Sequence, residues 1–207
     1  MELSKFKLVL GSQSPRRKEL LSWAKIPFEI VTADLDEVSS ETDPEEVAMD
    51  IAYQKGKAVF DKIDSSKNSF VISSDTIVVL NQKIYGKPKD RDDARKILSE
   101  LSDQTHFVIT GVCFIFKDDS GKLREHRFYD QTDVTFNEIT QDLMESYLDT
   151  GDSLDKAGAY GIQGPSLTFI SKVDGSYSNV VGFPLDRVIS ELKIILGEDW
   201  RSRFERA

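Results

Sequence analysis

The residues best suited to chemistry at the start of this sequence are the serines and arginines that follow its first apolar run. The run Leu8–Leu10 stops at Gly11, and Ser12-Gln-Ser-Pro-Arg-Arg17 then has the composition of a helix start. Ser14 suits the N-cap position and Pro15 suits the first helical position. Free backbone N–H groups at a helix start, next to two fixed cations, can hold phosphate. Many strand–turn–helix units look similar, so this segment alone indicates only a candidate anion site.

A second candidate is Asp75, which interrupts the otherwise apolar segment 70–80. Its neighbours Ser73, Ser74 and Thr76 are also polar, although the segment has the composition of a buried strand. An ionised carboxylate there needs a cation, several hydrogen bonds or a metal ion to offset the cost of burial. One interpretation is a strand bulge, or an edge Asp that binds backbone amides. The functional interpretation makes Asp75 a metal ligand, a general base for water, or both.

Glu37 belongs to the acidic stretch Asp34-Leu-Asp-Glu37, which follows a predicted strand. Such stretches are commonly solvated surface loops, and the local sequence favours that interpretation. Glu37 and Asp75 together, however, are the kind of carboxylate pair that Mg²⁺ or Mn²⁺ takes alongside substrate phosphates. The sequence has only two histidines and one cysteine. These numbers argue against a His/Cys metal site and give little support to a Ser-His-Asp hydrolase.

Lysines offer further phosphate contacts. Lys55 and Lys57 lie two positions apart in a predicted helix, so their side chains diverge by about 200° and at most one faces a cleft. Solvated helix lysines are the ordinary interpretation of both. Lys87 lies between Gly86 and Pro88, which restrict the backbone on both sides. A lysine held in this way is either a fixed phosphate contact or part of a plain turn.

A glycine-rich segment near residue 160 has the features of a ligand-binding loop. Gly158, Gly161 and Gly164 surround Tyr160 and Gln163, and glycine allows a backbone to approach a ligand closely. The Gln163 amide has both a donor and an acceptor, which suits the edge of a nucleobase. An ordinary loop with an exposed glutamine is the alternative. The sequence contains no GxxxxGK[ST] motif, which excludes a P-loop nucleotide site.

Alternating strands and helices must position these residues. Hydropathy predicts strands at 6–10, 28–32, 70–80, 83–85, 107–116 and 127–136, and helices at 15–23, 44–61, 90–101, 139–148 and 184–196. Asn81-Gln82 has the composition of a hairpin tip, and Asp90 is placed to cap the third helix. The chain shows no internal repeat or linker. We therefore predict one α/β domain over residues 1–207, with a cleft between two lobes.

Composition limits the classes of function. A net charge of −9 argues against general binding to nucleic acid or anionic membranes, but it permits a local cluster of cations that holds a small anion. No segment approaches the roughly 20 apolar residues of a membrane span, and Ser4, Lys5 and Lys7 interrupt the start of the chain. A single cysteine, Cys113, cannot form an internal disulfide, so we expect a cytoplasmic protein in which this thiol packs in the core.

Taken together, Ser12–Arg17, Ser74–Val78, Gly86–Pro88 and Asp155–Gly164 resemble the motifs of the Maf family of nucleotide pyrophosphatases. Gly182-Phe-Pro-Leu185 is similar to the closing motif of that family. Each match is modest, but the set keeps the family's order and spans nearly the whole chain. The resemblance implies a fold related to that of inosine triphosphate pyrophosphatases, with a central mixed, twisted sheet, flanking helices and a deep substrate cleft. It also implies hydrolysis of a nucleoside triphosphate to monophosphate and pyrophosphate, a divalent cation (Mg²⁺ or Mn²⁺) and a homodimer.

The resemblance also assigns roles to single residues. Asp75 matches the family's proton acceptor, and Glu37 matches a carboxylate at its metal site. Lys57 matches no family lysine. The positions that match phosphate contacts are Ser12, Arg16, Arg17, Lys55 and Lys87. The specificity signature of members acting on dTTP and UTP is matched by Arg16, Thr76 and Gln163, where a sister group acting on 7-methyl-GTP has Trp, Gln and Glu. A carboxamide at Gln163 suits the O4 and N3–H edge of thymine or uracil.

The chain departs from the family pattern at two places. Ser73-Ser74 stands where Gly-Ala is more usual, and Pro165-Ser-Leu-Thr168 stands where a further glycine-rich stretch is usual. We predict a dTTP/UTP pyrophosphatase whose partner is a small nucleotide, with no nucleic acid or membrane partner. The alternatives are a pyrophosphatase for other, non-standard nucleotides and a nucleotide-sensing regulator of cell division.

Overall fold

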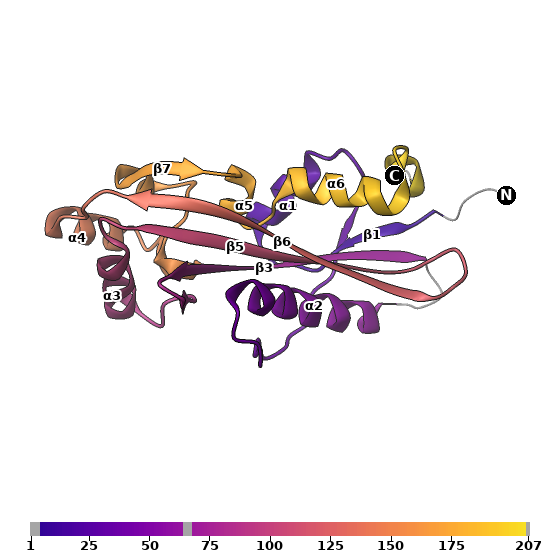
Figure 1. Cartoon of the computed structure of the whole chain (residues 1–207), viewed down its shortest axis with the longest axis horizontal. Coiled ribbons are helices and arrows are strands. Elements are labelled where there is room, and N and C mark those ends of the chain that lie inside the picture. Colours follow the sequence, from indigo (N-terminus) through magenta and orange to yellow (C-terminus); the bar gives the residue numbers. More distant parts are fainter. Residues whose placement is uncertain (1–4, 64–67, 206–207) are drawn as a thin grey trace.

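A seven-stranded mixed sheet runs along the molecule in the computed structural model, which describes residues 5–63 and 68–205 (Figure 1). The strands are β1 (Lys7–Leu10), β2 (Glu29–Ile30), β3 (Ser69–Leu80), β4 (Lys83–Tyr85), β5 (Thr105–Lys117), β6 (Leu123–Phe136) and β7 (Ile170–Asp174). Their order is β2-β1-β3-β5-β6-β7, and β4 pairs with β3 outside this path. β1 is parallel to β2 and β3, whereas the other pairs are antiparallel. The predicted central mixed sheet is confirmed.

The helices flank this sheet on both faces. They are α1 (Pro15–Ser22), α2 (Pro44–Lys62), α3 (Arg91–Leu101), α4 (Gln141–Asp149), α5 (Tyr177–Val181) and α6 (Leu185–Leu196), with short 3-10 turns at Ala157–Ala159, Pro165–Thr168 and Trp200–Arg203. In Figure 1, α2 covers one face, α1 and α6 cover the other, and α3, α4 and β7 gather at the opposite end from the termini. No helix in the described ranges has the length and apolar character needed to cross a membrane.

Strand periodicity divides the core between the two faces. On β3, Phe70 and Ile72 belong to a cluster that includes Leu20 of α1 and Leu192 of α6, whereas Val71 packs in the cluster that contains residues of α2. Successive side chains of a strand point to opposite faces, so one apolar segment fills both layers. A separate cluster forms the other lobe around α3 and α4, and long strands such as β3, β5 and β6 reach both lobes.

Local signals located most element ends correctly. The predicted hairpin tip is confirmed, because Asn81 and Gln82 adopt positive φ values of 50° and 65° between β3 and β4. Asp90 caps α3 by accepting a hydrogen bond from the backbone N–H of Asp93 at 2.8 Å. Ser14 occupies the N-cap position of α1, but its side chain makes no capping hydrogen bond. Its own backbone N–H instead donates to Ser12 Oγ at 3.2 Å.

Other elements differ from the prediction. The strand expected at 28–32 is only the two-residue β2, and β7 and α5 were not predicted. β3 pairs with one side of β1, and the short β2 pairs with its other side and forms the edge of the sheet. Cys113 is fully buried on β5, as predicted, and burial raises the pKa of its thiol to about 12.

The close packing of α2 on the sheet depends on Gly111. This residue lies opposite Asp75 in the β3–β5 register. A Cβ at Gly111 would lie 2.3 Å from the carbonyl carbon and oxygen of Ala48, in the backbone of α2. Real Cβ atoms do not approach backbone this closely, so the helix would have to move away from the sheet.

We therefore expect Gly111→Ala to lower the free energy of unfolding by about 2–3 kcal/mol. Urea denaturation followed by circular dichroism measures this loss. Gly86→Ala is the matched control, because an added Cβ there has nothing within 4 Å, and it should change stability by less than about 1 kcal/mol. Wild-type stability in Gly111→Ala would contradict the close packing of α2.

Candidate active site

The site begins at an interruption in the sheet beside β3. β1 pairs with β3 only as far as Ile72, where Gly11 N–H donates to the Ile72 carbonyl at 2.8 Å, and β4 pairs again from Val78. Among the described strands, none covers this edge between Ser73 and Ile77. A cavity of about 1100 Å³ opens along it, larger than the roughly 300–1,000 Å³ common for small-molecule pockets.

The polar residues of β3 divide between the faces of the sheet as its apolar residues do. Ser73 donates to the carbonyl of Ala52 on α2 at 2.7 Å, and Asp75 meets Lys55 of the same helix. Ser74 and Thr76 instead contact residues on the side of α1 and α5. Asp75 is only 8% exposed, and it pairs within β3–β5 in regular register. The alternative of a strand bulge at this position is therefore wrong.

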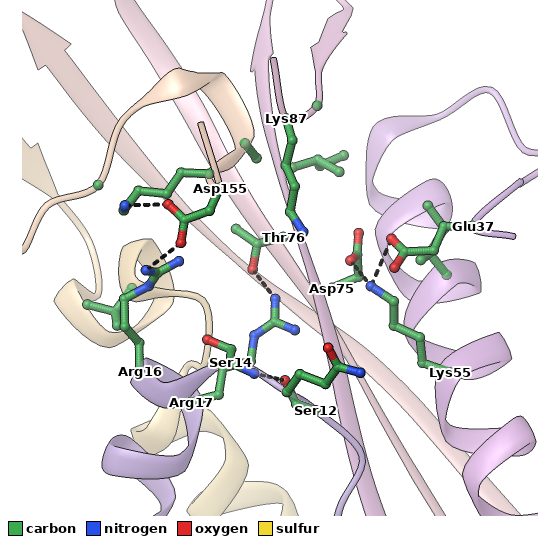
Figure 2. Close-up of a pocket in the computed structure, with 18 of the residues that line it drawn as sticks. Ser12, Ser14, Arg16, Arg17, Glu37, Lys55, Asp75, Thr76, Lys87 and Asp155 are labelled. Atoms are coloured by element: carbon green, nitrogen blue, oxygen red, sulfur yellow. Dashed lines mark hydrogen bonds and ion pairs between the residues drawn. The ribbon is translucent and has the colours of Figure 1, made fainter. Parts of the chain in front are cut away.

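Lys55 lies between two carboxylates (Figure 2). Its Nζ is 2.6 Å from Asp75 Oδ1 and 2.9 Å from Glu37 Oε2. Lys57, two positions along the helix, forms an ion pair with Asp61 instead. The prediction that at most one of these lysines faces the cleft is confirmed. The ammonium offsets the cost of burying the Asp75 carboxylate and brings the exposed Glu37 to the same point.

The two arginines at the start of α1 have different surroundings. Arg16 lies at the mouth of the cavity, where its Nη1 is 3.3 Å from Asp155 Oδ2 on the opposite wall (Figure 2). Burial raises the pKa of Asp155, but hydrogen bonds and charge from Lys156 and Arg16 outweigh this effect and leave that pKa below its usual value. Arg17 donates to three protein oxygens, on Ser74, Thr76 and Gly182.

The cavity brings the remaining predicted residues together. Lys87 extends into it from the segment after β4, toward Asp75 and Thr76 (Figure 2). Ser12 lines its floor after β1, and Gln163 lines the wall formed by the glycine-rich loop. Every residue predicted from the sequence for catalysis, phosphate, specificity or metal thus lines one cavity. Cations and carboxylates both line it, which suits a charged ligand that brings its own counter-cation.

The chemistry of the donors fits a hard divalent cation. Glu37 and Asp75 come from different segments, yet both point at one positive charge, the Lys55 ammonium. Mg²⁺ is commonly bound by one or two carboxylates together with substrate phosphates and water. No group of three or more His, Cys, Asp or Glu side chains in the described part of the chain could hold a metal. The pair Glu37 and Asp75 therefore suits a metal whose remaining ligands are phosphate oxygens and water.

Sequence reasoning missed the support of the glycine-rich loop. Tyr160 lines the cavity, and its hydroxyl lies 2.7 Å from Nε2 of His106, which is fully buried on β5. Burial raises the pKa of Tyr160 and lowers the pKa of His106 to about 4, so the imidazole is neutral at pH 7. Gly158, at a φ of 67°, packs so closely on Val78 that an added Cβ would lie 2.7 Å from it. A histidine inside a strand was the one available signal for this support.

Comparisons with known proteins identify the family of this chain. The model of the Maf-like protein family matches residues 7–195. A dTTP/UTP pyrophosphatase from Agathobacter rectalis is 40% identical over 196 residues, covering 90% of this chain and 96% of the relative. One from Bacillus cereus is 42% identical over 188 residues, covering 90% and 94%. Among solved structures, a HAM1 protein from Coxiella burnetii aligns with 91% of this chain and 99% of its own, at 12% identity and a TM-score of 0.43.

The buried His106 predicts a pH dependence of stability. Its folded pKa of about 4 lies below the ordinary 6.5, so only the unfolded chain takes up a proton between these values. The stability that this group contributes is therefore complete above pH 6.5 and is lost as the pH falls toward 4, by about 2 kcal/mol at pH 5.

Urea unfolding at pH 8 and pH 5 should show this loss in the wild type and not in His106→Phe. Tyr160→Phe is the control and should keep the loss, because desolvation alone lowers this pKa. Equal losses in wild type and His106→Phe would refute the assignment.

Proposed function

The chain belongs to the Maf-like protein family, and we propose that it is a nucleoside triphosphate pyrophosphatase that hydrolyses dTTP and UTP. One observation carries this proposal: a single cavity gathers a carboxylate pair, several cations and a glycine-rich loop around the open edge of β3. The relatives named dTTP/UTP pyrophosphatase, similar over 90% of this chain, support the choice of substrates.

In the proposed mechanism, Asp75 acts as the general base. It accepts a proton from a water whose oxygen attacks the α-phosphorus, and the bond between that phosphorus and the bridging oxygen to the β-phosphate breaks. The electron pair leaves with pyrophosphate, and the nucleoside monophosphate remains. Burial of Asp75 beside Lys55 supports this role, because the carboxylate is fixed in place and shielded from bulk water.

Cationic side chains hold the triphosphate. Arg16 and Lys87 lie on opposite walls of the cavity, and Ser12 lies at the start of α1, where backbone N–H groups are available. Lys55 can exchange a carboxylate for a phosphate oxygen without leaving the cavity. Together these groups offset the negative charge that develops on departing pyrophosphate. Glu37 and Asp75 would hold Mg²⁺ or Mn²⁺, which, when bound, supplies positive charge to the phosphate oxygens.

The glycine-rich loop selects the base in this proposal. Gln163 presents an amide to the cavity from that loop, and an amide pairs with the O4 and N3–H edge of thymine or uracil. Arg16 and Thr76 complete the specificity set, one at the mouth and one on β3. The ion pair between Arg16 and Asp155 connects the glycine-rich loop to the side of the cavity where the triphosphate binds in this proposal.

We further propose a single domain over residues 1–207, a homodimer and a cytoplasmic location. The shared strands β3, β5 and β6 support one domain, since both lobes pack on them. The resemblance to the family supports the dimer. A buried, unpaired Cys113 suits a reducing compartment.

Pyrophosphate release from dTTP, UTP, ITP and 7-methyl-GTP tests the activity, measured with Mg²⁺, with Mn²⁺ and with a chelator. We expect metal-dependent release that is fastest for dTTP and UTP. Asp75→Asn should release pyrophosphate at least about 100-fold more slowly while still binding nucleotide, because it lacks the base but keeps the cationic side chains that hold the triphosphate. Preference for ITP or 7-methyl-GTP would overturn the substrate assignment. No release from any nucleotide would overturn the enzyme assignment in favour of a nucleotide-sensing protein.

Replacing Lys55 tests the carboxylate pair as a cation site. Lys55→Met leaves Glu37 and Asp75 without their shared ammonium, so Mn²⁺ should bind nucleotide-free protein about tenfold more tightly, a change of about 1.4 kcal/mol. Electron paramagnetic resonance of free Mn²⁺ measures this affinity. Lys57→Met is the matched control, since Lys57 pairs with Asp61 and does not line the cavity as described, and it should leave Mn²⁺ binding unchanged. Identical Mn²⁺ affinities in the two variants would argue against a metal at this carboxylate pair.

A further inference from the structure

Arg17 is bound by the protein on three sides. Its Nε donates to the Gly182 carbonyl at 2.8 Å, its Nη1 to the Ser74 carbonyl at 2.7 Å and its Nη2 to Thr76 Oγ1 at 3.0 Å. Its neighbour Arg16 has one ion pair, at 3.3 Å, with the side chain of Asp155. Burial lowers the pKa of Arg17, and the charge of Asp75 opposes that effect. Adjacent arginines of one motif therefore have different surroundings.

One contact of Arg17 replaces a missing strand. The last backbone hydrogen bond between β1 and β3 is accepted by Ile72, and the next carbonyl on that edge belongs to Ser74. No strand in the described part of the chain pairs with that edge at Ser74. A buried backbone carbonyl without a donor costs free energy. The guanidinium supplies the donor that a continued β1 would have supplied.

The contact between Arg17 and Thr76 begins a series of hydrogen bonds in which each donor and each acceptor can be assigned. Thr110 donates its only hydroxyl proton to the carbonyl of Asn179 at 3.0 Å. In the 3.0 Å contact between Thr76 and Thr110, Thr76 must then be the donor. Thr76 has thereby used its own proton, and it accepts from Arg17. The direction is Arg17 to Thr76 to Thr110 to the Asn179 carbonyl, so the Thr76 hydroxyl cannot donate to a nucleotide.

The far end of this chain is anchored. Asn179 is fully buried on α5, and its Nδ2 donates to the Val108 carbonyl at 2.9 Å and to Thr132 Oγ1 at 3.0 Å. Gly182, which ends α5, has a φ of 107°, and an added Cβ would lie 3.0 Å from Thr76 Oγ1. α5 therefore provides a fixed point on the sheet against which Arg17 and β3 are held.

We propose that Arg17 is a positioning residue, which holds β3 on both sides of Asp75 and does not bind the triphosphate. The inference rests on the proposed function, in which Asp75 is the base. Arg17 fixes the two neighbours of Asp75, through the backbone carbonyl of Ser74 at the strand edge and the side chain of Thr76 on one face of the sheet, and the Asp75 carboxylate meets Lys55 on the other face. This role differs from the phosphate contact that the family resemblance implies for Arg17. It also makes Thr110 and Asn179 part of the support of the base.

Arg17→Lys and Arg16→Lys separate positioning from phosphate binding. Lysine keeps the charge but cannot reach three acceptors as a fork. We expect Arg17→Lys to lower kcat about 100-fold, because a small displacement of the base is costly. Its Kd for a dTTP analogue with a methylene group between the α- and β-phosphates should stay within about twofold of the wild-type value. Arg16→Lys should instead weaken binding of that analogue. Weaker binding in Arg17→Lys, equal to that in Arg16→Lys, would overturn the proposal.

Thr110→Val provides a second test, because valine keeps the shape of the side chain and replaces only the hydroxyl with a methyl group. Thr110 lies behind Thr76 and is not among the described residues that line the cavity. We expect Thr110→Val to lower kcat and to leave the Kd for the dTTP analogue unchanged. When it is added to Arg17→Lys, it should lower kcat by less than it does alone, because both substitutions break the same hydrogen-bond network. Wild-type kcat in Thr110→Val would count against the chain of hydrogen bonds.

Hydrogen exchange of backbone amides separates failure of this proposal from failure of the proposed function. In Arg17→Lys and Thr110→Val, amides of residues 73–77 and 179–183 should exchange faster than in the wild type and in Arg16→Lys. This readout needs no turnover, so it holds even for a protein that hydrolyses none of the nucleotides. Unchanged exchange in both variants would refute the positioning role.

Discussion

The rest of the site depends on a carboxylate placed in the middle of a buried strand. Asp75 is 8% exposed and lies in a strand, β3, whose residues are mostly buried. Such a group needs a cation, several hydrogen bonds or a metal ion to offset its burial, and Lys55 provides a cation at 2.6 Å. This distance requires α2 to lie directly on the sheet, which Gly111 permits opposite Asp75. The ion pair that stabilises the buried Asp75 carboxylate therefore depends on the close packing of α2 against the sheet.

The interruption of the sheet beside β3 has two consequences. It makes room for a ligand, because β1 ends and β4 begins only at Val78. It also leaves the Ser74 carbonyl without a strand partner, and Arg17 satisfies it. Since strand side chains alternate between faces, the carboxylate of Asp75 lies on one side of the sheet, and the Thr76 hydroxyl that Arg17 contacts lies on the other. The chemistry and its support are thus separated by the thickness of one strand.

The cavity lies between two cores that share the same long strands. One core contains α1 and α6, and the other contains α3 and α4. The glycine-rich loop belongs to the second core, where Tyr160 contacts the buried His106 and Gly158 packs on Val78. Arg16 reaches across from the first core to Asp155 of that loop. The two walls are therefore joined through the sheet below and through an ion pair at the mouth.

Short-range signals were sufficient for most elements and for several site residues. Asn81-Gln82 and Asp90 specify a turn and a cap through their own side chains and backbone, and helical periodicity alone predicts that Lys55 and Lys57 cannot both face the cleft. A carboxylate in an apolar strand identified Asp75 without knowledge of the fold, because burial of such a charge always demands compensation.

Only the folded chain revealed which groups are already bound by other parts of the protein. Arg16 and Arg17 look equivalent in the sequence, but their partners lie 139 and 165 positions away, at Asp155 and Gly182. The short β2, the strand β7 and the helix α5 likewise depend on distant partners and not on local composition. Local patterns report which donors and acceptors a segment carries. Tertiary contacts decide which of them remain free for a ligand, because each proton can be donated only once.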